Sequence, residues 1–260
     1  MFFYSTEVTS SQISSDSPLF QRTKKAYELV KDKIHGNILE IGPGEGYGLE
    51  ILSQTQKELN ISAVDKSKYA IQRLKNKFPN ANVIQQRVPP LSKIASDSQD
   101  FVIAFQVIEH IKNDTYFLKE IHRVLKPNGT LFLTTPNANR SVSRNPWHYK
   151  EYTFEELLQL NNRIFQESKV KGITGSEVAM NYYEKNKKSV AKILKWDIFK
   201  IEKHAPRFIL KLPYELLNRF NRTNLLKKHS EIITNIDENS YFLTEECDEN
   251  TLDFFCELKK

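Results

Sequence analysis

Short apolar segments alternate with segments of helical periodicity over most of the chain. Five of the apolar segments have the length and composition of buried strands: 37–41, 61–65, 82–86, 100–105 and 130–135. Segments with apolar residues at helical spacing separate them: 22–33, 49–52, 68–78 and 115–125. Thr153 and Glu156 form a capping box, which predicts the start of another helix. Strands and helices that alternate in this way form a parallel sheet with helices on both faces.

This pattern predicts an α/β fold with a Rossmann-like, doubly wound and mostly parallel sheet of seven strands. The last two strands are expected at 169–173 and 252–258, and the final one is expected to run antiparallel. Residues 1–21 are rich in Ser and Thr without a clear period, and we interpret them as an N-terminal arm or lid. The remainder divides into a core over 22–175, a basic helical insertion over 176–239 that caps the sheet, and a C-terminal strand segment over 240–260.

The composition is that of a globular protein, with 39% hydrophobic and 27% charged residues. No segment approaches the roughly 20 apolar residues that span a bilayer. The opening Met1-Phe2-Phe3-Tyr4 lacks a basic start and a long apolar run, so we expect no signal peptide. The two cysteines, Cys247 and Cys256, are too few for a disulfide framework or a cysteine zinc site, and we therefore expect a cytoplasmic protein.

The net charge of +6 belongs to one segment of the chain. Residues 184–228 carry 13 Lys and Arg against 4 Asp and Glu, whereas 231–260 carry 9 acidic and 2 basic residues. The basic insertion therefore has three interpretations. It is a solvated cap with a buried apolar face, a surface that holds a lipid-linked or anionic acceptor by peripheral membrane contact, or an RNA-binding surface. Its aromatic residues show no recognisable RNA-binding pattern, and we do not expect a nucleic-acid partner.

The chain has only 8 glycines, and half of them, Gly42, Gly44, Gly46 and Gly48, directly follow the first predicted strand. Glycine permits positive φ and lets a ligand approach the backbone. The carboxyl end of the first strand is where doubly wound sheets bind nucleotides. This concentration of glycines therefore predicts a nucleotide-binding loop.

The residues around the loop favour a cationic nucleoside without a pyrophosphate. A dinucleotide site needs a third glycine at position 47, where this chain has Tyr47, and a phosphate-binding Lys-Ser or Lys-Thr pair is missing. Glu40 precedes the glycines, and its carboxylate would repel pyrophosphate but attract an ammonium group. Asp65 ends the second strand, where a carboxylate can accept both ribose hydroxyls.

These residues resemble the motifs of class I S-adenosylmethionine-dependent methyltransferases. Residues 38–48, Ile-Leu-Glu-Ile-Gly-Pro-Gly-Glu-Gly-Tyr-Gly, look like the first motif of that family. Asp65 matches its second-strand acid, 100–110 resemble its fourth-strand motif, and 118–137 resemble the following helix, turn and strand. The chain is most similar to the subgroup that includes the ubiquinone-pathway O-methyltransferases, described as methyltransferase types 11 and 23. The resemblance covers about 22–173 and leaves the insertion outside.

The resemblance implies a set of residues that bind S-adenosylmethionine and its product S-adenosylhomocysteine. Glu40, Gly42 and Gly44 would line the methionine end, with Pro43 shaping the turn. Asp65 would hold the ribose, with Lys66 beside it, and Gln106 would offer its backbone carbonyl to the ammonium group. The remaining positions are Arg87 and Val88 around adenine and Arg22 near the cofactor carboxylate; many relatives have Asp at the position of Arg87.

On the acceptor side, two histidines follow strand ends at the predicted binding edge. Methyl transfer from a sulfonium is an in-line displacement, and a general base is needed only when the acceptor carries a proton. His110 and His148 are the candidates, although each also suits a structural role in its loop. We expect O-methylation of a small molecule, a glycan or a lipid-linked metabolite, and the oligomeric state stays open.

Two rival functions use the same residues. Gln106, Glu109, His110 and His148 resemble the metal-binding set of RNA 3′-terminal ribose methyltransferases, which has Glu where this chain has Gln106. A neutral amide is a poor ligand for a hard divalent cation, so we expect no metal site. The other rival is a non-catalytic S-adenosylmethionine-binding scaffold, and the intact Glu40 loop argues against it.

Overall fold

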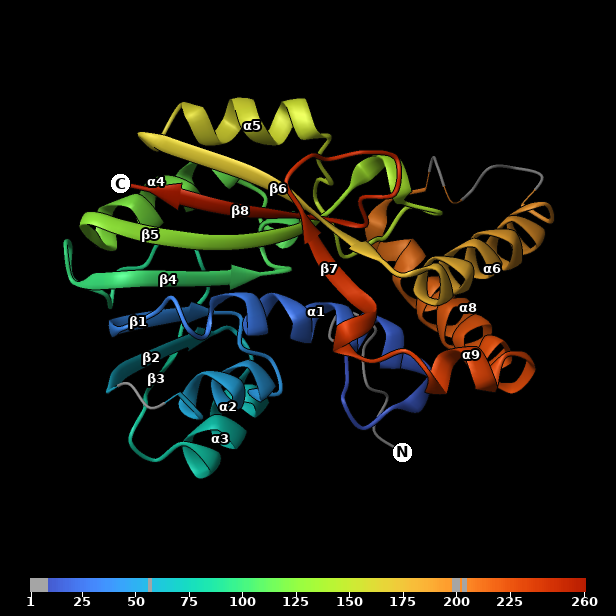
Figure 1. The fold of residues 1–260 in the computed structure, drawn as a ribbon, viewed down its shortest axis with the longest axis horizontal. Helices are drawn as coiled ribbons and strands as arrows, with labels where there is room; N and C mark the ends of the chain where they lie inside the picture. Colours follow the sequence, from blue (N-terminus) through green and yellow to red (C-terminus); the bar gives the residue numbers. More distant parts are fainter. Residues whose placement is uncertain (1–8, 56–57, 198–201, 203–204) are drawn as a thin grey trace.

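One mixed sheet organises the protein (Figure 1). The computed structural model describes residues 9–55, 58–197, 202 and 205–260. In this part of the chain the sheet has eight strands in the order β3-β2-β1-β4-β5-β8-β6-β7. Their bounds are β1 Gly36–Ile41, β2 Leu59–Asp65, β3 Asn82–Gln85, β4 Gln99–Phe105, β5 Leu125–Pro136, β6 Glu167–Gly175, β7 Tyr241–Thr244 and β8 Asp253–Lys259.

The strand directions confirm the predicted doubly wound fold and add one strand to it. Strands β3, β2, β1, β4 and β5 run parallel, and the last strand, β8, pairs antiparallel with both β5 and β6 as predicted. The expected count of seven is one short, because Tyr241–Thr244 pairs antiparallel with β6. This short segment at the sheet edge carries little of the alternation that marks a longer strand.

The core lies on both faces of the sheet. Successive residues of a strand point to opposite faces, and Ile38 and Leu39 of β1 accordingly belong to two different hydrophobic clusters. Helices α4 and α5 complete the cluster of Leu39, while α1 and α2 contribute to that of Ile38. The helices that cover the sheet are α1 Ser17–Val30, α2 Tyr47–Ser53, α3 Lys68–Lys77, α4 Asp114–Val124 and α5 Phe154–Asn162. The predicted capping box of Thr153 and Glu156 is present at the start of α5.

Helix α1 begins earlier than the pattern predicts. We expected a loose arm over 1–21, but the helix starts at Ser17 and has Pro18 in its first turn. The preceding Asp16 is fully buried, and its ion pairs with Arg219 and Arg222 at 2.9 and 3.0 Å offset the cost of burying its charge. These partners lie far away in the sequence, so no local pattern predicts the ion pairs. Residues 1–8 lie outside the described part.

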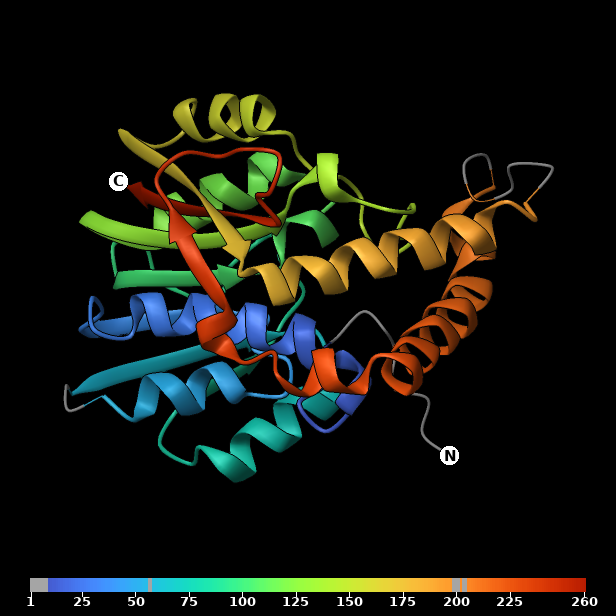
Figure 2. The ribbon, with the colours of Figure 1, turned by 45° about the vertical axis from the view of Figure 1, so that its right-hand side comes forward.

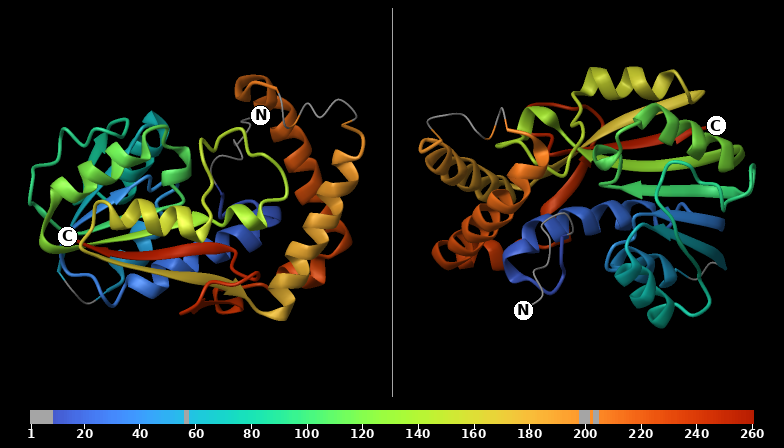
Figure 3. Two further views of the ribbon diagram at one scale, coloured as in Figure 1. Left: turned by 90° about the horizontal axis from the view of Figure 1, so that it is seen from above. Right: turned by 180° about the vertical axis from the view of Figure 1, so that it is seen from behind.

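The insertion forms a helical hairpin that extends beyond the sheet (Figures 2 and 3). Helix α6 (Glu177–Leu194) leaves the end of β6, and α8 (Arg207–Lys228) returns beside it. The two helices are joined by a hydrogen bond from Ser189 to Asn221, and α9 (Ser230–Thr234) leads back to β7. Residues 198–201, 203 and 204 of the predicted insertion lie outside the described part. Among the described residues, no helix is both long and apolar enough to cross a bilayer.

Candidate active site

The glycine loop leaves the carboxyl end of β1 in a conformation that favours glycine. Gly42, Gly44 and Gly46 have φ angles of 72°, 54° and 81°. The loop is tied to the next strand, because Gly42 N donates to the carbonyl of Val64 at 2.8 Å. A Cβ atom on Gly42 would lie 2.8 Å from the side chain of Val107. The first glycine is therefore required by its φ angle and by the close approach of the segment after β4.

Glu40 is the second-to-last residue of β1, just before this loop, and is 1% exposed. The hydroxyl of Tyr27 in α1 donates to its Oε1 at 2.6 Å. Its Oε2 is buried, and among the described residues it has no hydrogen-bond partner. Burial raises the pKa of Glu40 to about 7, although the hydrogen bond from Tyr27 acts in the opposite direction. The carboxyl group is therefore placed to bind a donor or a cation supplied from outside the chain.

Asp65 ends β2 beside the same loop. The register pairs Ile41 with Val64, so the ends of the two parallel strands meet at one edge of the sheet. The Asp65 carboxylate accepts from Ser67 N at 2.7 Å and from Gly44 N at 3.4 Å. These backbone donors hold the carboxylate next to the glycine turn. The neighbouring Lys66 accepts a hydrogen bond on its backbone carbonyl from the Gln85 amide at 3.4 Å.

Gln106 follows β4 with a φ angle of 56°, which is unusual for a residue other than glycine. Its backbone N donates to the carbonyl of Thr134 at 2.9 Å, and its side-chain amide contacts Thr134 Oγ1 at 3.3 Å. Both contacts hold the end of β4 against β5. The predicted cofactor-binding residue therefore lies at the same sheet edge as Glu40 and Asp65.

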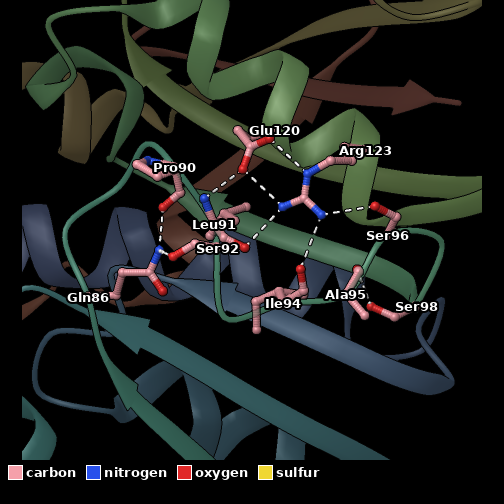
Figure 4. A network of polar contacts seen from close by, with 10 residues as sticks. All are labelled: Gln86, Pro90, Leu91, Ser92, Ile94, Ala95, Ser96, Ser98, Glu120 and Arg123. Atoms are coloured by element: carbon pink, nitrogen blue, oxygen red, sulfur yellow. Dashed lines mark hydrogen bonds and ion pairs between the residues drawn. The ribbon is translucent and has the colours of Figure 1, made fainter.

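The loop after β3, which contains Arg87 and Val88, is held in place by side chains of helix α4 (Figure 4). The Arg123 guanidinium donates to the carbonyls of Leu91 and Ile94 at 3.0 and 3.1 Å. It also forms an ion pair with Glu120 at 2.8 Å. Arg87 is exposed and Val88 is half-buried. This network fixes the loop after β3, which borders the predicted adenine side of the site.

Arg22 forms an ion pair with a buried carboxylate, which the sequence did not predict. Its Nε lies 2.8 Å from Oδ2 of Asp253 at the start of β8, and the two side chains are 13% and 2% exposed. The guanidinium also lies over the ring of Tyr183, 5.3 Å from the centroid. The pair joins α1 to the sheet, and Arg22 lines a cavity of about 310 Å³.

His110 and His148 come together beyond the end of β5, with ring centroids 4.8 Å apart. His148 Nδ1 lies 2.5 Å from Glu151 Oε1, and His110 Nδ1 lies 3.1 Å from the carbonyl of Trp147. Asn145 contacts the other nitrogen of His148, Nε2, at 2.9 Å. The carboxylate of Glu151 favours a proton on Nδ1, which leaves Nε2 as the basic nitrogen of His148.

A third titratable group lies beside the two histidines. Potential ligand atoms of Glu109, His110 and His148 lie within 4.8 Å of one another, so this part of the described chain could also hold a metal ion. Glu109 is 1% exposed and accepts from Thr135 at 3.1 Å. Burial raises the pKa of Glu109 to about 7, and nearby His148 acts against this rise.

Two adjoining cavities lie between this cluster and the helical hairpin. The larger, of about 560 Å³, is lined by the loop 141–151 together with Leu194, Glu202 and Arg207. The smaller one extends to Arg22 and to Tyr182, Tyr183 and Tyr214 of the hairpin. His148 and Glu151 line both cavities. The pair therefore faces a space large enough for a small molecule or for part of a larger one.

Three residues of this edge were missed from the sequence. Tyr27 looked like one more residue of an amphipathic helix, and nothing local marks it as the partner of Glu40. Glu151 lies three residues after His148, a spacing that could have suggested the pair. Asp253 precedes the apolar run Phe254-Phe255-Cys256, and a charge in such a strand signals a buried partner.

Comparison with known proteins places the chain among methyltransferases. A probable S-adenosylmethionine-dependent methyltransferase of Mycobacterium tuberculosis is 30% identical over 160 residues, which is 59% of this chain and 57% of that protein. The chain thus matches less than two thirds of the length of this relative. The mitochondrial ubiquinone biosynthesis O-methyltransferase of Dictyostelium discoideum is 27% identical over 39% of this chain and 35% of its own length.

Solved structures share the fold at low sequence identity. An S-adenosylmethionine-dependent methyltransferase of Thermotoga maritima aligns with a TM-score of 0.57 and 15% identity, over 95% of this chain and 91% of that one. Residues 18–171, more than half of the chain, match the family described as a methyltransferase domain. The predicted family and its cofactor, S-adenosylmethionine, are thereby confirmed, and the chain belongs to the methyltransferase domain family.

Proposed function

We propose that the protein is an S-adenosylmethionine-dependent methyltransferase that methylates an oxygen of a small molecule, a glycan or a lipid-linked metabolite. The observation that carries this proposal is the buried Glu40 Oε2, which has no hydrogen-bond partner among the described residues. It lies beneath a loop of positive-φ glycines and near the strand-end carboxylate of Asp65. A buried acceptor of this kind suits a ligand that brings an ammonium group.

The residues present fit the cofactor. Glu40, Gly42 and Gly44 would hold its methionine end, with Pro43 in the turn and Gln106 contributing its backbone carbonyl. Asp65 would hold the ribose with Lys66 beside it, and the loop of Arg87 and Val88 would border the adenine. Arg22 is directed to Asp253, so we assign it to the cavity wall and keep its contact with the cofactor carboxylate as a proposal. When bound, S-adenosylmethionine supplies an electrophilic methyl group on a sulfonium.

His148 is our candidate for the general base, with His110 beside it. An acceptor hydroxyl in the cavity would give its proton to His148 Nε2, while Glu151 holds Nδ1 and stabilises the imidazolium that forms. Asn145 now contacts Nε2, and it would yield that position to the acceptor. The matched relatives include both O- and C-methyltransferases by name, so their names do not decide which atom is methylated. The candidate base favours oxygen, because a hydroxyl acceptor must lose its proton.

Calorimetry with S-adenosylmethionine and S-adenosylhomocysteine tests the proposal. We expect both to bind the folded protein, and we expect Asp65→Ala to weaken binding by roughly tenfold or more, because a hydrogen-bonded carboxylate is lost. Glu246→Ala, a change of an exposed acid, is the matched control. If neither compound binds the folded wild-type protein, the proposal fails.

The RNA ribose 2′-O-methyltransferase remains a second candidate because Glu109, His110 and His148 lie together. It requires a divalent cation at these residues and RNA binding with a steep salt dependence. Turnover that needs neither favours the small acceptor.

The non-catalytic scaffold is the third candidate. A [4+2]-cyclase shares the fold with a TM-score of 0.55 at 12% identity, so the fold alone does not define the chemistry. Formation of a methylated product with any acceptor excludes the scaffold.

A further inference from the structure

Helix α8 exposes a continuous apolar surface to solvent. Phe208, Leu212, Leu216 and Phe220 repeat every four residues, and Ile209 and Leu217 lie beside them. Their exposed fractions are 74%, 69%, 55% and 67% for the first four and 52% and 48% for the last two. We call these six residues the apolar face of α8. It spans three turns of helix, a length of about 18 Å.

The orientation of α8 is determined by contacts on its other side. Asn221 is hydrogen-bonded to Ser189 of α6, and Arg222 is paired with the buried Asp16. Trp147 donates to Glu215 at 3.0 Å, and Lys211 lies 3.8 Å from the centroid of the Trp147 ring. Rotation of the helix to bury its apolar face would break these contacts. The apolar face is therefore turned outward by the fold itself.

An outward surface of six large apolar side chains is unusual for a soluble protein. Scattered exposed apolar residues are common, but a contiguous group marks a surface that binds something. Trp196, just beyond the end of α6, is 85% exposed and lies in the same hairpin. The charge near the apolar face indicates what kind of partner binds it.

The hairpin that carries this surface also carries positive charge. Six of its lysines are exposed: Lys187, Lys188, Lys192, Lys195, Lys227 and Lys228. The last two lie at the C-terminal end of α8, about two turns beyond Phe220. Phe, Leu and Trp side chains together with lysines are the composition of helices that lie in a membrane interface and bind anionic lipids. A second copy of this chain would bring the same positive charge and would be repelled.

We propose that the apolar face of α8 docks the protein onto an anionic lipid bilayer, with α8 lying in the plane of the interface. The inner side of α8 holds Trp147, which precedes His148, and Arg207 lines the larger cavity one residue before Phe208. Docking would therefore keep the candidate acceptor cavity beside the bilayer. The proposal concerns lipid binding and stands independently of the proposed methyl transfer.

Co-sedimentation with vesicles tests this proposal. We expect the protein to bind phosphatidylcholine vesicles that contain phosphatidylserine, and to bind pure phosphatidylcholine much more weakly. The triple variant Leu212→Gln, Leu216→Gln and Phe220→Gln should lose roughly tenfold or more of this affinity, because apolar contact anchors the helix. The changed residues are exposed, so thermal unfolding and far-UV circular dichroism should stay unchanged. Tyr69→Gln, at a residue of α3 that is 84% exposed, is the matched control.

The charge is tested separately with Lys227→Glu and Lys228→Glu. This double variant should bind anionic vesicles more weakly, and added salt should weaken the wild type in the same direction. The proposal is overturned if the wild type does not bind anionic vesicles, or if the triple variant binds them as well as the wild type does. A wild-type dimer in sedimentation velocity that the triple variant abolishes, without vesicle binding, would assign the surface to a second copy instead.

Discussion

The hydroxyl of Tyr27 donates a 2.6 Å hydrogen bond to the buried carboxyl group of Glu40. The contact joins helix α1 to the end of the first strand, directly beneath the glycine loop. It satisfies one oxygen of Glu40, while the other has no hydrogen-bond partner among the described residues. We therefore expect the protonation state of this carboxyl group to control the binding of a cation at the loop.

We predict that cofactor affinity rises with pH as Glu40 ionises. Burial raises the pKa of Glu40 to about 7, and only the ionised form attracts an ammonium group. The affinity for S-adenosylhomocysteine should increase by up to about tenfold per pH unit below 7 and level off above it. Calorimetry over this range measures the effect. Tyr27→Phe removes a hydrogen bond that lowers this pKa, so its curve should move to higher pH, while Glu40→Gln should give the flattest curve.

Without ligand, we expect Glu40 to destabilise the fold at neutral pH. Its pKa is higher in the folded protein, about 7, than its ordinary value of 4.5, so the unfolded chain releases the proton first. The contribution of Glu40 to the free energy of unfolding is therefore largest below pH 4.5, and it decreases as the pH rises toward 7. Glu40→Gln should be more stable than the wild type above pH 7 and lose this advantage near pH 4.5. Urea unfolding at several pH values measures the difference, and a constant difference would contradict the prediction.

Gly48→Ala should disturb the contact between α2 and α1. A Cβ atom at Gly48 would lie 2.2 Å from the ring of Tyr27, so one of the two helices must move. We expect a loss of about 1–3 kcal/mol in the free energy of unfolding, the usual cost of overpacking a core. Gln54→Ala, an exposed change just beyond α2, is the control and should stay within about 0.5 kcal/mol of the wild type. Equal stability of the two variants would contradict the assigned packing.

His148→Gln should lower kcat by roughly 100-fold or more without a change in S-adenosylhomocysteine affinity, since a general base acts on the acceptor. Glu151→Gln keeps the shape of its partner and removes the charge, so it should cause a smaller loss. Single-turnover kinetics with an acceptor identified by product mass spectrometry measure both effects. The exposed His35→Gln is the control. An unchanged kcat for His148→Gln would leave the two histidines with a structural role.

Chelation should leave turnover intact. One of the four groups expected of the metal set, Gln106, is an amide that contacts Thr134. Both imidazoles are already hydrogen-bonded through Nδ1. We therefore expect the same kcat before and after treatment with EDTA. Metal analysis of the purified protein provides the second measurement. A strict requirement for a divalent cation would favour the RNA ribose candidate.

The sequence by itself determined the sheet core, the glycine loop and the position of Asp65. Each depends on a few neighbouring residues: periodicity distinguishes strands from helices, and glycines after a strand mark a turn with positive φ. Parallel topology then brings the ends of β1 and β2 to one edge, as the register confirms. The capping box of Thr153 was equally local and was confirmed for the same reason.

Only the tertiary structure decided which distant groups meet. Tyr27 contacts Glu40, Arg22 pairs with Asp253, and His110 lies against His148, although nothing in the local pattern requires these pairs. Helical periodicity likewise shows that α8 is amphipathic without showing which face is covered. Its contacts with α6, Asp16 and the loop of Trp147 turn the apolar face outward, because buried polar partners must be satisfied. Local sequence specifies elements, whereas pairing over long separations depends on the packed chain as a whole.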